Sequence, residues 1–242
     1  MSVYTDETYG ELIADVYDDW YGEVDPQMLE MLTRLAGGGR ALELGIGTGR
    51  VAIPLAESGI KMYGIDASQA MVEKLKLKQG SEGINLHLGN FVEISFTEKF
   101  DLVYVVFNTI FALLTQEEQV HCFQTVAKHL KSKGLFTVEA FIPDLSRFQG
   151  GQTVRAIQLE SQQTRLDASI IDPIHQVITS QHIVLDNEKT RINPVKLRYI
   201  WPSEMDLMAR LAGLQLLHRW GDWNQASFTS SSKKHISVYG RK

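Results

Sequence analysis

Cysteine is nearly missing from this chain of 242 residues, which contains only Cys122. A single cysteine excludes an intrachain disulfide and any metal site built from several cysteines, and it is usual in a reducing compartment. Long hydrophobic runs are missing too, since the longest, LVYVVF at residues 102–107, is far too short to span a bilayer. The first ten residues, MSVYTDETYG, lack the basic start and apolar stretch of a secretion signal. We therefore expect a cytoplasmic protein that is not bound to a membrane.

Positive charge is also scarce. The sequence has 24 Lys and Arg residues against 29 Asp and Glu residues, for a net charge of -5. Its densest basic stretch, EKLKLK at residues 73–78, is interrupted by two leucines. Because no basic patch is present to attract a phosphate backbone, nucleic acid is not expected as a partner.

The sequence does contain a regular succession of helix and strand patterns. Apolar residues from Tyr9 to Trp20 recur at steps of three and four, which predicts a helix. Asp25, Pro26 and Gly37 mark the start and the end of a second helix. Five strands then alternate with helices, a pattern typical of parallel strands joined by right-handed crossovers. The strands are RALEL (40–44), KMYGID (61–66), INLHL (84–88), FDLVYVVF (100–107) and LFTVEAF (135–141), and the helices are RVAIPLAES (50–58), QAMVEKLKLKQ (69–79, capped by Ser68) and QEEQVHCFQTVAKHL (116–130, begun by a Thr115/Glu118 capping box).

A different pattern occupies residues 152–201. Three β-rich segments, TVRAIQL (153–159), HQVITSQHIVL (175–185) and VKLRYIW (195–201), are separated by turn-forming residues. This predicts an antiparallel meander inserted between parallel elements. A helix capped by Ser203 and ended by Gly213 follows, and then two strands, LQLLHRW (214–220) and HISVYG (235–240).

These elements predict one α/β domain over residues 1–242. The expected fold is a Rossmann-like three-layer sandwich around a mostly parallel seven-stranded sheet, whose last strand is antiparallel, with the β meander inserted. Its parts are a helical cap (1–38), a ligand-binding core (39–142), the inserted meander (150–202) and a C-terminal helix with two strands (203–242).

The stretch LELGIGTGR, residues 42–50, carries three glycines at alternate positions: Gly45, Gly47 and Gly49. Alternate glycines let a backbone approach a ligand closely. Their spacing differs from the G-x-G-x-x-G of dinucleotide sites, and Arg50 takes the position of the third glycine in that motif. Glu43, two residues before the first glycine, would repel two phosphates but suits an ammonium group.

Asp66 ends the second predicted strand, about 20 residues past the turn, where a carboxylate is well placed to bind both hydroxyls of a ribose. A ligand with an ammonium group, a ribose and no phosphate is indicated, and S-adenosylmethionine fits this description. The alternative for the turn is a plain connection without a ligand, which three glycines make unfavourable. For Asp66 alone, a helix cap is a strong alternative.

The motif E-L-G-I-G-T-G (residues 43–49) followed by GIDAS (64–68) resembles the class I S-adenosylmethionine-dependent methyltransferases. The resemblance implies that Glu43 and the glycine backbone hold the methionine moiety, Asp66 the ribose, and Ala67 and Met71 the adenine face. This sequence differs from the family at Asn90, where the family usually has Asp. The amide oxygen of Asn90 can still accept a hydrogen bond from the adenine amino group. The cofactor-binding residues that the resemblance implies are Tyr17, Glu43, Gly45, Ile46, Gly47, Gly49, Arg50, Asp66, Ala67, Met71, Asn90, Phe91 and Phe107.

The acceptor is expected to be a small molecule. Family members that act on nucleobases or glutamine amides carry N-P-P-Y/F after the fourth strand, whereas this chain has FNTIF at residues 107–111. VYDDWY (16–21), the fourth strand and the meander resemble enzymes of natural-product pathways, including amino-sugar N-methyltransferases. The resemblance implies an N-terminal helix that closes over the cofactor and a meander (150–202) that shapes the substrate pocket. It also implies methyl transfer to nitrogen or oxygen in secondary metabolism. Methylation at carbon stays open.

The candidate catalytic residues are Glu139, His182 and Tyr17, which could serve as a base or orient the acceptor. Each has a structural alternative, such as an ion pair for Glu139 and a strand-packing role for His182; His175 is a further histidine expected in a turn. Tyr199 and Trp201 share one face of a predicted strand, where they would line the pocket or pack in the core. The expected acceptor-binding residues are Tyr21, Asn108, Phe111, Glu139, His182, Tyr199 and Trp201, and no metal site is expected.

Two further functions and one assembly remain open. A nicotinamide-dependent oxidoreductase would use the same strand order, although Glu43 and Arg50 argue against it. A protein that binds S-adenosylmethionine without catalysis is the other alternative. An exposed edge of the meander is where two chains would pair into a homodimer.

Overall fold

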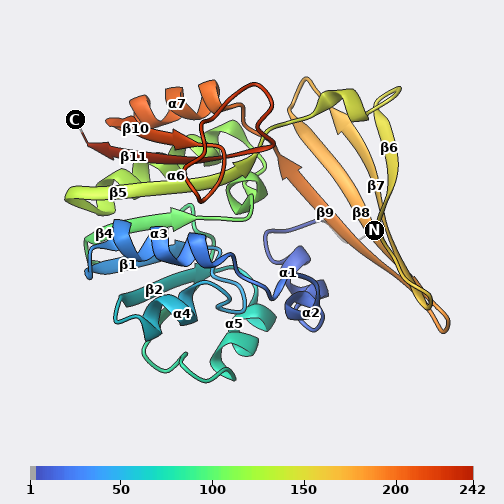
Figure 1. The fold of residues 1–242 in the computed structure, drawn as a ribbon, viewed down its shortest axis with the longest axis horizontal. Helices are drawn as coiled ribbons and strands as arrows, with labels where there is room; N and C mark the ends of the chain where they lie inside the picture. Colours follow the sequence, from blue (N-terminus) through green and yellow to red (C-terminus); the bar gives the residue numbers. More distant parts are fainter. Residues whose placement is uncertain (1–3, 242) are drawn as a thin grey trace.

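Two β-sheets organise residues 4–241, the range that this computed structural model describes (Figure 1). The larger sheet has the strand order β10-β11-β5-β4-β1-β2-β3. Strands β1 to β5 run parallel, and β11 is antiparallel to both β5 and β10, as predicted. The strands are β1 (Arg40–Leu44), β2 (Lys61–Asp66), β3 (Asn85–Leu88), β4 (Phe100–Val105), β5 (Leu130–Phe141), β10 (Leu214–Trp220) and β11 (Lys234–Arg241). The predicted helical cap (1–38) includes residues 1–3, and the predicted C-terminal part (203–242) includes residue 242. These four residues lie outside the described range.

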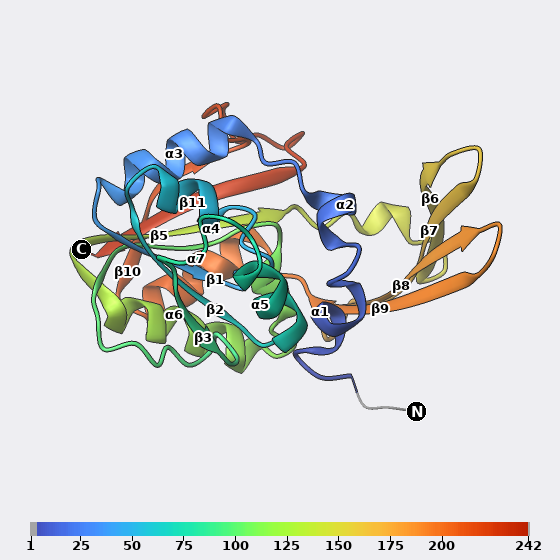
Figure 2. The ribbon, with the colours of Figure 1, turned by 90° about the horizontal axis from the view of Figure 1, so that it is seen from below.

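Helices cover both faces of this sheet and make three layers (Figure 2). Met28 and Leu32 of α3 and Leu55 of α4 pack on one face. Cys122 of α6 and Met205 of α7 pack on the other. The helices are α1 (Thr8–Ile13), α2 (Tyr17–Tyr21), α3 (Pro26–Ala36), α4 (Ala52–Glu57), α5 (Gln69–Lys76), α6 (Gln116–His129) and α7 (Pro202–Leu211). None of the helices within residues 4–241 has the length and hydropathy to cross a membrane.

Most helix ends follow the predicted signals. Asp25 accepts the N–H of Gln27 at 2.9 Å, and Gly37 ends α3 in the left-handed conformation. The capping box between Thr115 and Glu118 is present. Two predictions were wrong. The N-terminal helix is two short helices, because the chain turns after Ile13, and periodicity alone cannot detect a turn that keeps the apolar side chains inward. Trp201 rather than Ser203 precedes α7, since Pro202 occupies its first position.

The second sheet is the antiparallel meander, in the order β6-β7-β8-β9. It stands beside the ends toward which β4 and β5 point (Figure 1). Its strands are β6 (Gln152–Leu159), β7 (Gln163–Asp172), β8 (Val177–Asp186) and β9 (Thr190–Arg198). The pattern had predicted three β-rich segments and missed β7, whose inward positions Asp167 and Ser169 are polar although buried. On its outer edge, β6 exposes Val154 and Leu159. An exposed edge of the meander stays the predicted place for pairing of two chains.

Arg198, at the end of β9, joins the meander to the rest of the molecule. Its buried guanidinium donates to Gln176 Oε1 at 2.8 Å and to Glu204 Oε1 at 2.9 Å, and it also bonds the side chain of Gln119. Gln119 in turn donates to the carbonyl of Arg198 at 2.9 Å. One buried charge thus joins α6, α7 and the β7–β8 turn to β9.

We expect Arg198→Ala to lower the free energy of unfolding by about 3–5 kcal/mol, because it leaves a largely buried carboxylate without its partner. Chemical denaturation followed by circular dichroism measures the change. Arg210→Ala, which removes an exposed arginine from α7, is the control and should change stability by less than about 0.5 kcal/mol. Equal effects of the two substitutions would contradict the anchoring role.

Candidate active site

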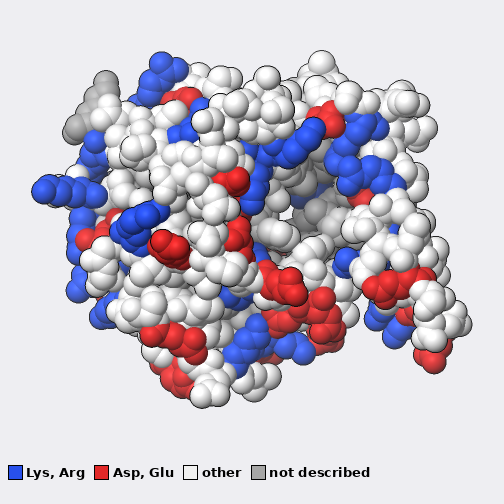
Figure 3. Space-filling model, viewed as in Figure 1, with Lys and Arg blue, Asp and Glu red and all other residues white. Residues whose placement is uncertain are grey.

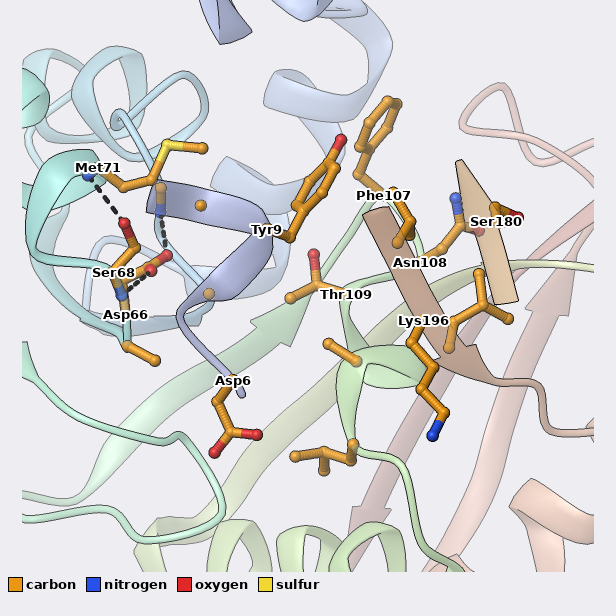
Figure 4. Close-up of a pocket in the computed structure, with 18 of the residues that line it drawn as sticks. Asp6, Tyr9, Asp66, Ser68, Met71, Phe107, Asn108, Thr109, Ser180 and Lys196 are labelled. Carbon is orange, nitrogen blue, oxygen red and sulfur yellow. Dashed lines mark hydrogen bonds between the residues drawn. The ribbon is translucent and has the colours of Figure 1, made fainter. Parts of the chain in front are cut away.

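A cavity of about 380 Å³ opens between the carboxyl ends of the parallel strands, the N-terminal helices and the meander. Figure 3 shows the molecule hollowed between its two sheets. This is the end of an open α/β sheet at which ligands bind. Side chains from all three parts line it (Figure 4).

The glycine turn after β1 forms one wall. Gly45 and Gly47 line the cavity with φ of +71° and +55°, a conformation that side chains other than glycine rarely adopt. Among residues 4–241, apart from Gly47 itself and its two chain neighbours, no atom lies within 4 Å of the position that a Cβ would take on Gly47. A ligand can therefore approach this backbone directly.

Asp66, at the end of β2, holds this turn. Its Oδ2 accepts the N–H of Gly47 at 2.7 Å, and its Oδ1 accepts the N–H of Ser68 at 2.9 Å (Figure 4). Burial raises the pKa of this carboxyl, and the backbone N–H bonds act against that shift. Asp66 lines the cavity and keeps unused lone pairs on both oxygens for a ligand's hydroxyls.

Glu43 lies behind the turn and does not line the cavity. Its Oε2 accepts the hydroxyl of Tyr104 at 2.9 Å, and burial raises its pKa to about 8. A buried carboxyl of this kind favours a cationic ligand nearby, because a positive charge would stabilise its ionised form.

A cluster of aromatic side chains lies above the glycine turn and closes the cavity there. Tyr21 packs on Tyr17, with ring centroids 5.3 Å apart, and on Phe107 at 5.1 Å. Tyr9 of α1 reaches into the same space (Figure 4). Burial raises the pKa of Tyr17 to about 12, so its phenol is protonated at neutral pH and can donate a hydrogen bond. The aromatic faces suit a cationic ligand.

The loop after β4 carries two residues in the left-handed conformation, Phe107 (φ 56°) and Asn108 (φ 67°). Glu139 of β5 holds it, since its Oε2 accepts the N–H of Phe107 at 3.0 Å. The other oxygen of Glu139 accepts from Trp223 Nε1 at 3.0 Å and from Lys234 Nζ at 2.8 Å. Glu139 is therefore buried beneath the loop and does not line the cavity, whereas Asn108 does.

The inner face of the meander forms the opposite wall. Asp167 of β7 lies directly opposite His182 of β8, and Ser169 lies opposite Ser180. The hydroxyl of Ser169 contacts Asp167 Oδ1 at 2.7 Å and Ser180 Oγ at 2.6 Å. Burial lowers the pKa of His182, and the nearby Asp167 opposes that shift. The histidine is therefore neutral at pH 7 and can accept a proton.

The structure places the predicted site residues in two groups. Those that line the cavity are Tyr17, Tyr21, Gly45, Gly47, Asp66, Ala67, Met71, Asn90, Phe91, Phe107, Asn108 and His182. Those outside its lining are Glu43, Ile46, Gly49, Arg50, Phe111, Glu139, Tyr199 and Trp201.

Tyr199 and Trp201 do not line the pocket because β9 ends at Arg198 and the chain then turns toward α7. Tyr199 is buried in the core, and so is Phe111, which packs against Phe141 at 4.9 Å. His175 lies in the β7–β8 turn and contacts Asp172 at 2.6 Å.

Sequence reasoning missed several residues that line the cavity: Asp6, Tyr9, Thr109, Arg147, Asp167, Ser180 and Lys196. The signal that could have revealed β7 is the alternation of polar residues: Asp167 and Ser169 are two residues apart and therefore share one face of a strand. Tyr9 had been assigned only to the apolar face of a helix.

Comparisons with known proteins decide the family. A methyltransferase domain model matches residues 41–134. The solved structure of the CcbJ methyltransferase from Streptomyces caelestis is 37% identical, with a TM-score of 0.93 over 98% of this chain and 99% of that one. The chain belongs to the S-adenosylmethionine-dependent methyltransferases. The sequence had left open a methyltransferase, an oxidoreductase and a binding protein without catalysis. The protein is a methyltransferase.

Two relatives have names that include their acceptor groups. The cypemycin N-terminal methyltransferase of a Streptomyces species is 28% identical over 208 residues, 84% of each chain. A dTDP-4-amino-2,3,4,6-tetradeoxy-D-glucose N,N-dimethyltransferase of Saccharopolyspora spinosa is 23% identical over 193 residues, which is 75% of this chain and 76% of that one.

The cavity fits the cofactor of this family. The open space at Gly47 admits a ligand against the backbone, and Asp66 offers acceptors for a ribose. We expect Gly47→Ala to weaken binding of S-adenosylhomocysteine at least about tenfold, or 1.4 kcal/mol, because the methyl group occupies this space. Isothermal titration calorimetry measures the dissociation constant.

Gly37→Ala is a matched control for that measurement. Gly37 has a φ of +56°, equally open surroundings and no contact with the cavity. Both substitutions should cost about 1–2 kcal/mol of stability for the left-handed conformation. If Gly37→Ala weakened binding as much as Gly47→Ala, the effect would be one of stability and not of contact.

We expect Glu139→Gln to lower stability by about 1.5–3 kcal/mol, since the neutral amide loses charge-assisted bonds with Lys234 and Phe107. The midpoint of thermal or denaturant unfolding measures the loss. Glu117→Gln, an exposed change in the first turn of α6, should leave stability unchanged. A large loss of turnover with unchanged stability would instead support direct catalysis by Glu139.

Proposed function

We propose that this methyltransferase transfers a methyl group to the nitrogen of a small-molecule amine in a natural-product pathway. The observation that carries the proposal is the pair formed by Asp167 and His182 on the cavity wall, a carboxylate opposite a neutral histidine. The names of the two relatives, an N-terminal methyltransferase and an N,N-dimethyltransferase, support nitrogen as the acceptor atom.

The cofactor half of the cavity is assigned to the glycine turn and Asp66. S-adenosylmethionine supplies an electrophilic methyl group when it is bound. We assign the ribose to Asp66, the methionine end to Gly45, Gly47 and Tyr17, and the adenine to the side formed by Ala67, Met71 and Phe91. Glu43 lies outside the lining and has a pKa raised to about 8. A positively charged ligand in front of the turn favours its ionised form, and the two charges then attract each other.

The acceptor half has the chemistry that an amine needs. An aliphatic amine arrives as an ammonium ion at neutral pH and must lose a proton before its lone pair can attack. Asp167, with an exposed fraction of 7%, attracts the cation, and His182 takes the proton. Tyr9, Tyr21 and Phe107 offer aromatic faces to the same charge.

Positioning and exclusion of water complete the role of the protein. Methyl transfer is an in-line displacement, so it depends on alignment of the acceptor more than on a complex set of catalytic groups. α1 and α2 cover the cavity, and Glu139 fixes the loop that carries Phe107 and Asn108. Glu139 therefore acts as a positioning residue in this proposal.

The acceptor atom can be tested with matched compounds. Purified protein, S-adenosylmethionine and pairs of acceptors that differ only in an amine or a hydroxyl are incubated, and product masses are recorded. The proposal expects a mass gain of one or more methyl groups on the amines and none on the matched alcohols. Methylation of the alcohols alone would indicate an O-methyltransferase.

We expect His182→Asn to lower kcat about 10²-fold or more, the usual contribution of a general base. In the wild type, kcat/KM should fall as the pH drops below the lowered pKa of His182, because protonation removes the base. Asp167→Asn should shift this acid limb to lower pH, since loss of the negative charge makes the imidazole easier to deprotonate. Steady-state rates between pH 5 and 9 measure both effects.

Asp186→Asn provides the control for these rates, because it removes an acidic charge at the far end of β8, outside the cavity. An acid limb that keeps its midpoint in Asp167→Asn would rule out coupling between the two residues. Full activity in His182→Asn would rule out the histidine as base.

A further inference from the structure

The side chain of Asn90, after β3, is already engaged on both sides. Its Oδ1 accepts the N–H of Val92 at 2.9 Å, and its Nδ2 donates to Asp6 Oδ2. Only this orientation of the amide satisfies both partners, because Val92 offers a donor and Asp6 an acceptor. The amide oxygen that the sequence assigned to the adenine amino group thus faces its own loop, and the amide nitrogen faces Asp6.

Asp6 supplies the acceptor at this position. It lines the same cavity as Ala67, Met71 and Asn90, and it lies on the segment that leads into α1. Figure 4 shows Asp6 apart from the hydrogen bonds that join Asp66, Ser68 and Met71. Its carboxylate accepts one bond from Asn90 and retains further lone pairs.

The helix that follows Asp6 is attached to the cofactor side of the molecule. Glu11 Oε1 accepts the hydroxyl of Ser68 at 2.8 Å and the N–H of Ala70 at 2.9 Å, both at the start of α5. Gly10 lies so close to Ser68 that a Cβ would come within 2.5 Å of the serine Cβ. These contacts keep the segment that carries Asp6 next to the loop that contains Asn90.

We propose that Asp6 binds the exocyclic amino group of adenine, with Asn90 orienting its carboxylate. The inference rests on the assignment of the adenine to this side of the cavity. An amino group has only donors to offer, and a carboxylate is its strongest neutral-pH partner among side chains. A hypoxanthine base carries a carbonyl oxygen at the same place, and two acceptors repel each other. Asp6 thus selects adenine and links base recognition to the N-terminal segment that covers the cavity.

Calorimetric titration with S-adenosylhomocysteine and its inosine analogue, S-inosylhomocysteine, tests the proposal without turnover. The wild type should prefer the adenine ligand by about tenfold or more, a difference of 1.4 kcal/mol. In Asp6→Asn the adenine ligand should bind about tenfold more weakly, and the preference should shrink, because the amide can donate to the carbonyl of the inosine analogue.

Two variants separate recognition from structure. Asp19→Asn makes the same chemical change on α2, outside the cavity lining, and should leave both affinities unchanged. The double variant Asp6→Asn with Asn90→Asp exchanges the acid and the amide, and it should restore the preference for adenine.

The outcomes are distinct. An unchanged preference in Asp6→Asn, or equal weakening of both ligands, would overturn the role of Asp6 in reading the base. Absence of binding of either ligand to the folded wild type would overturn the cofactor assignment itself, and the inference with it.

Discussion

The site depends on two carboxylates, each of which holds the backbone of the turn at the end of a neighbouring strand. Asp66 at the end of β2 holds the glycine turn of β1, and Glu139 in β5 holds the loop after β4. Both turns use left-handed backbone, which must be held by its surroundings when the residue is not glycine. Side-chain carboxylates on neighbouring strands thus help to place the two strand ends that form the centre of the cavity.

This difference explains which parts of the site could be predicted. The turn after β1 is visible in the sequence because glycine marks the left-handed conformation, and Asp66 follows at a recognisable distance. The loop after β4 has Phe107 and Asn108 in the same conformation without any glycine, so its shape and the role of Glu139 could not be predicted. Local signals such as Pro26 with Gly37, and the Thr115 capping box, predicted helix ends well, whereas the break after Ile13 has no such signal.

The meander shows a second limit of sequence reasoning. A strand pattern is recognised by apolar residues on its buried face, but β7 and β8 turn Asp167, Ser180 and His182 toward the cavity. A sheet that faces a polar ligand has a pattern close to that of a loop, so β7 was missed. The end of β9 depends on Arg198, whose partners lie on α6, α7 and the β7–β8 turn, far away in sequence, and Tyr199 and Trp201 were misplaced for the same reason.

The wall that carries Asp167, Ser180 and His182 comes from one unbroken stretch of chain, β6 to β9. The glycine turn, Asp66 and the loop after β4 all lie before it, and the last strands of the large sheet come after it. The sequence order therefore separates this wall from the turns at the strand ends. A recombination event, or a designed chimera, with one junction before β6 and one after Arg198 replaces the whole wall as a block and leaves the turns at the strand ends untouched. In the function proposed above this wall binds the acceptor, so such a replacement is expected to change which acceptors are used.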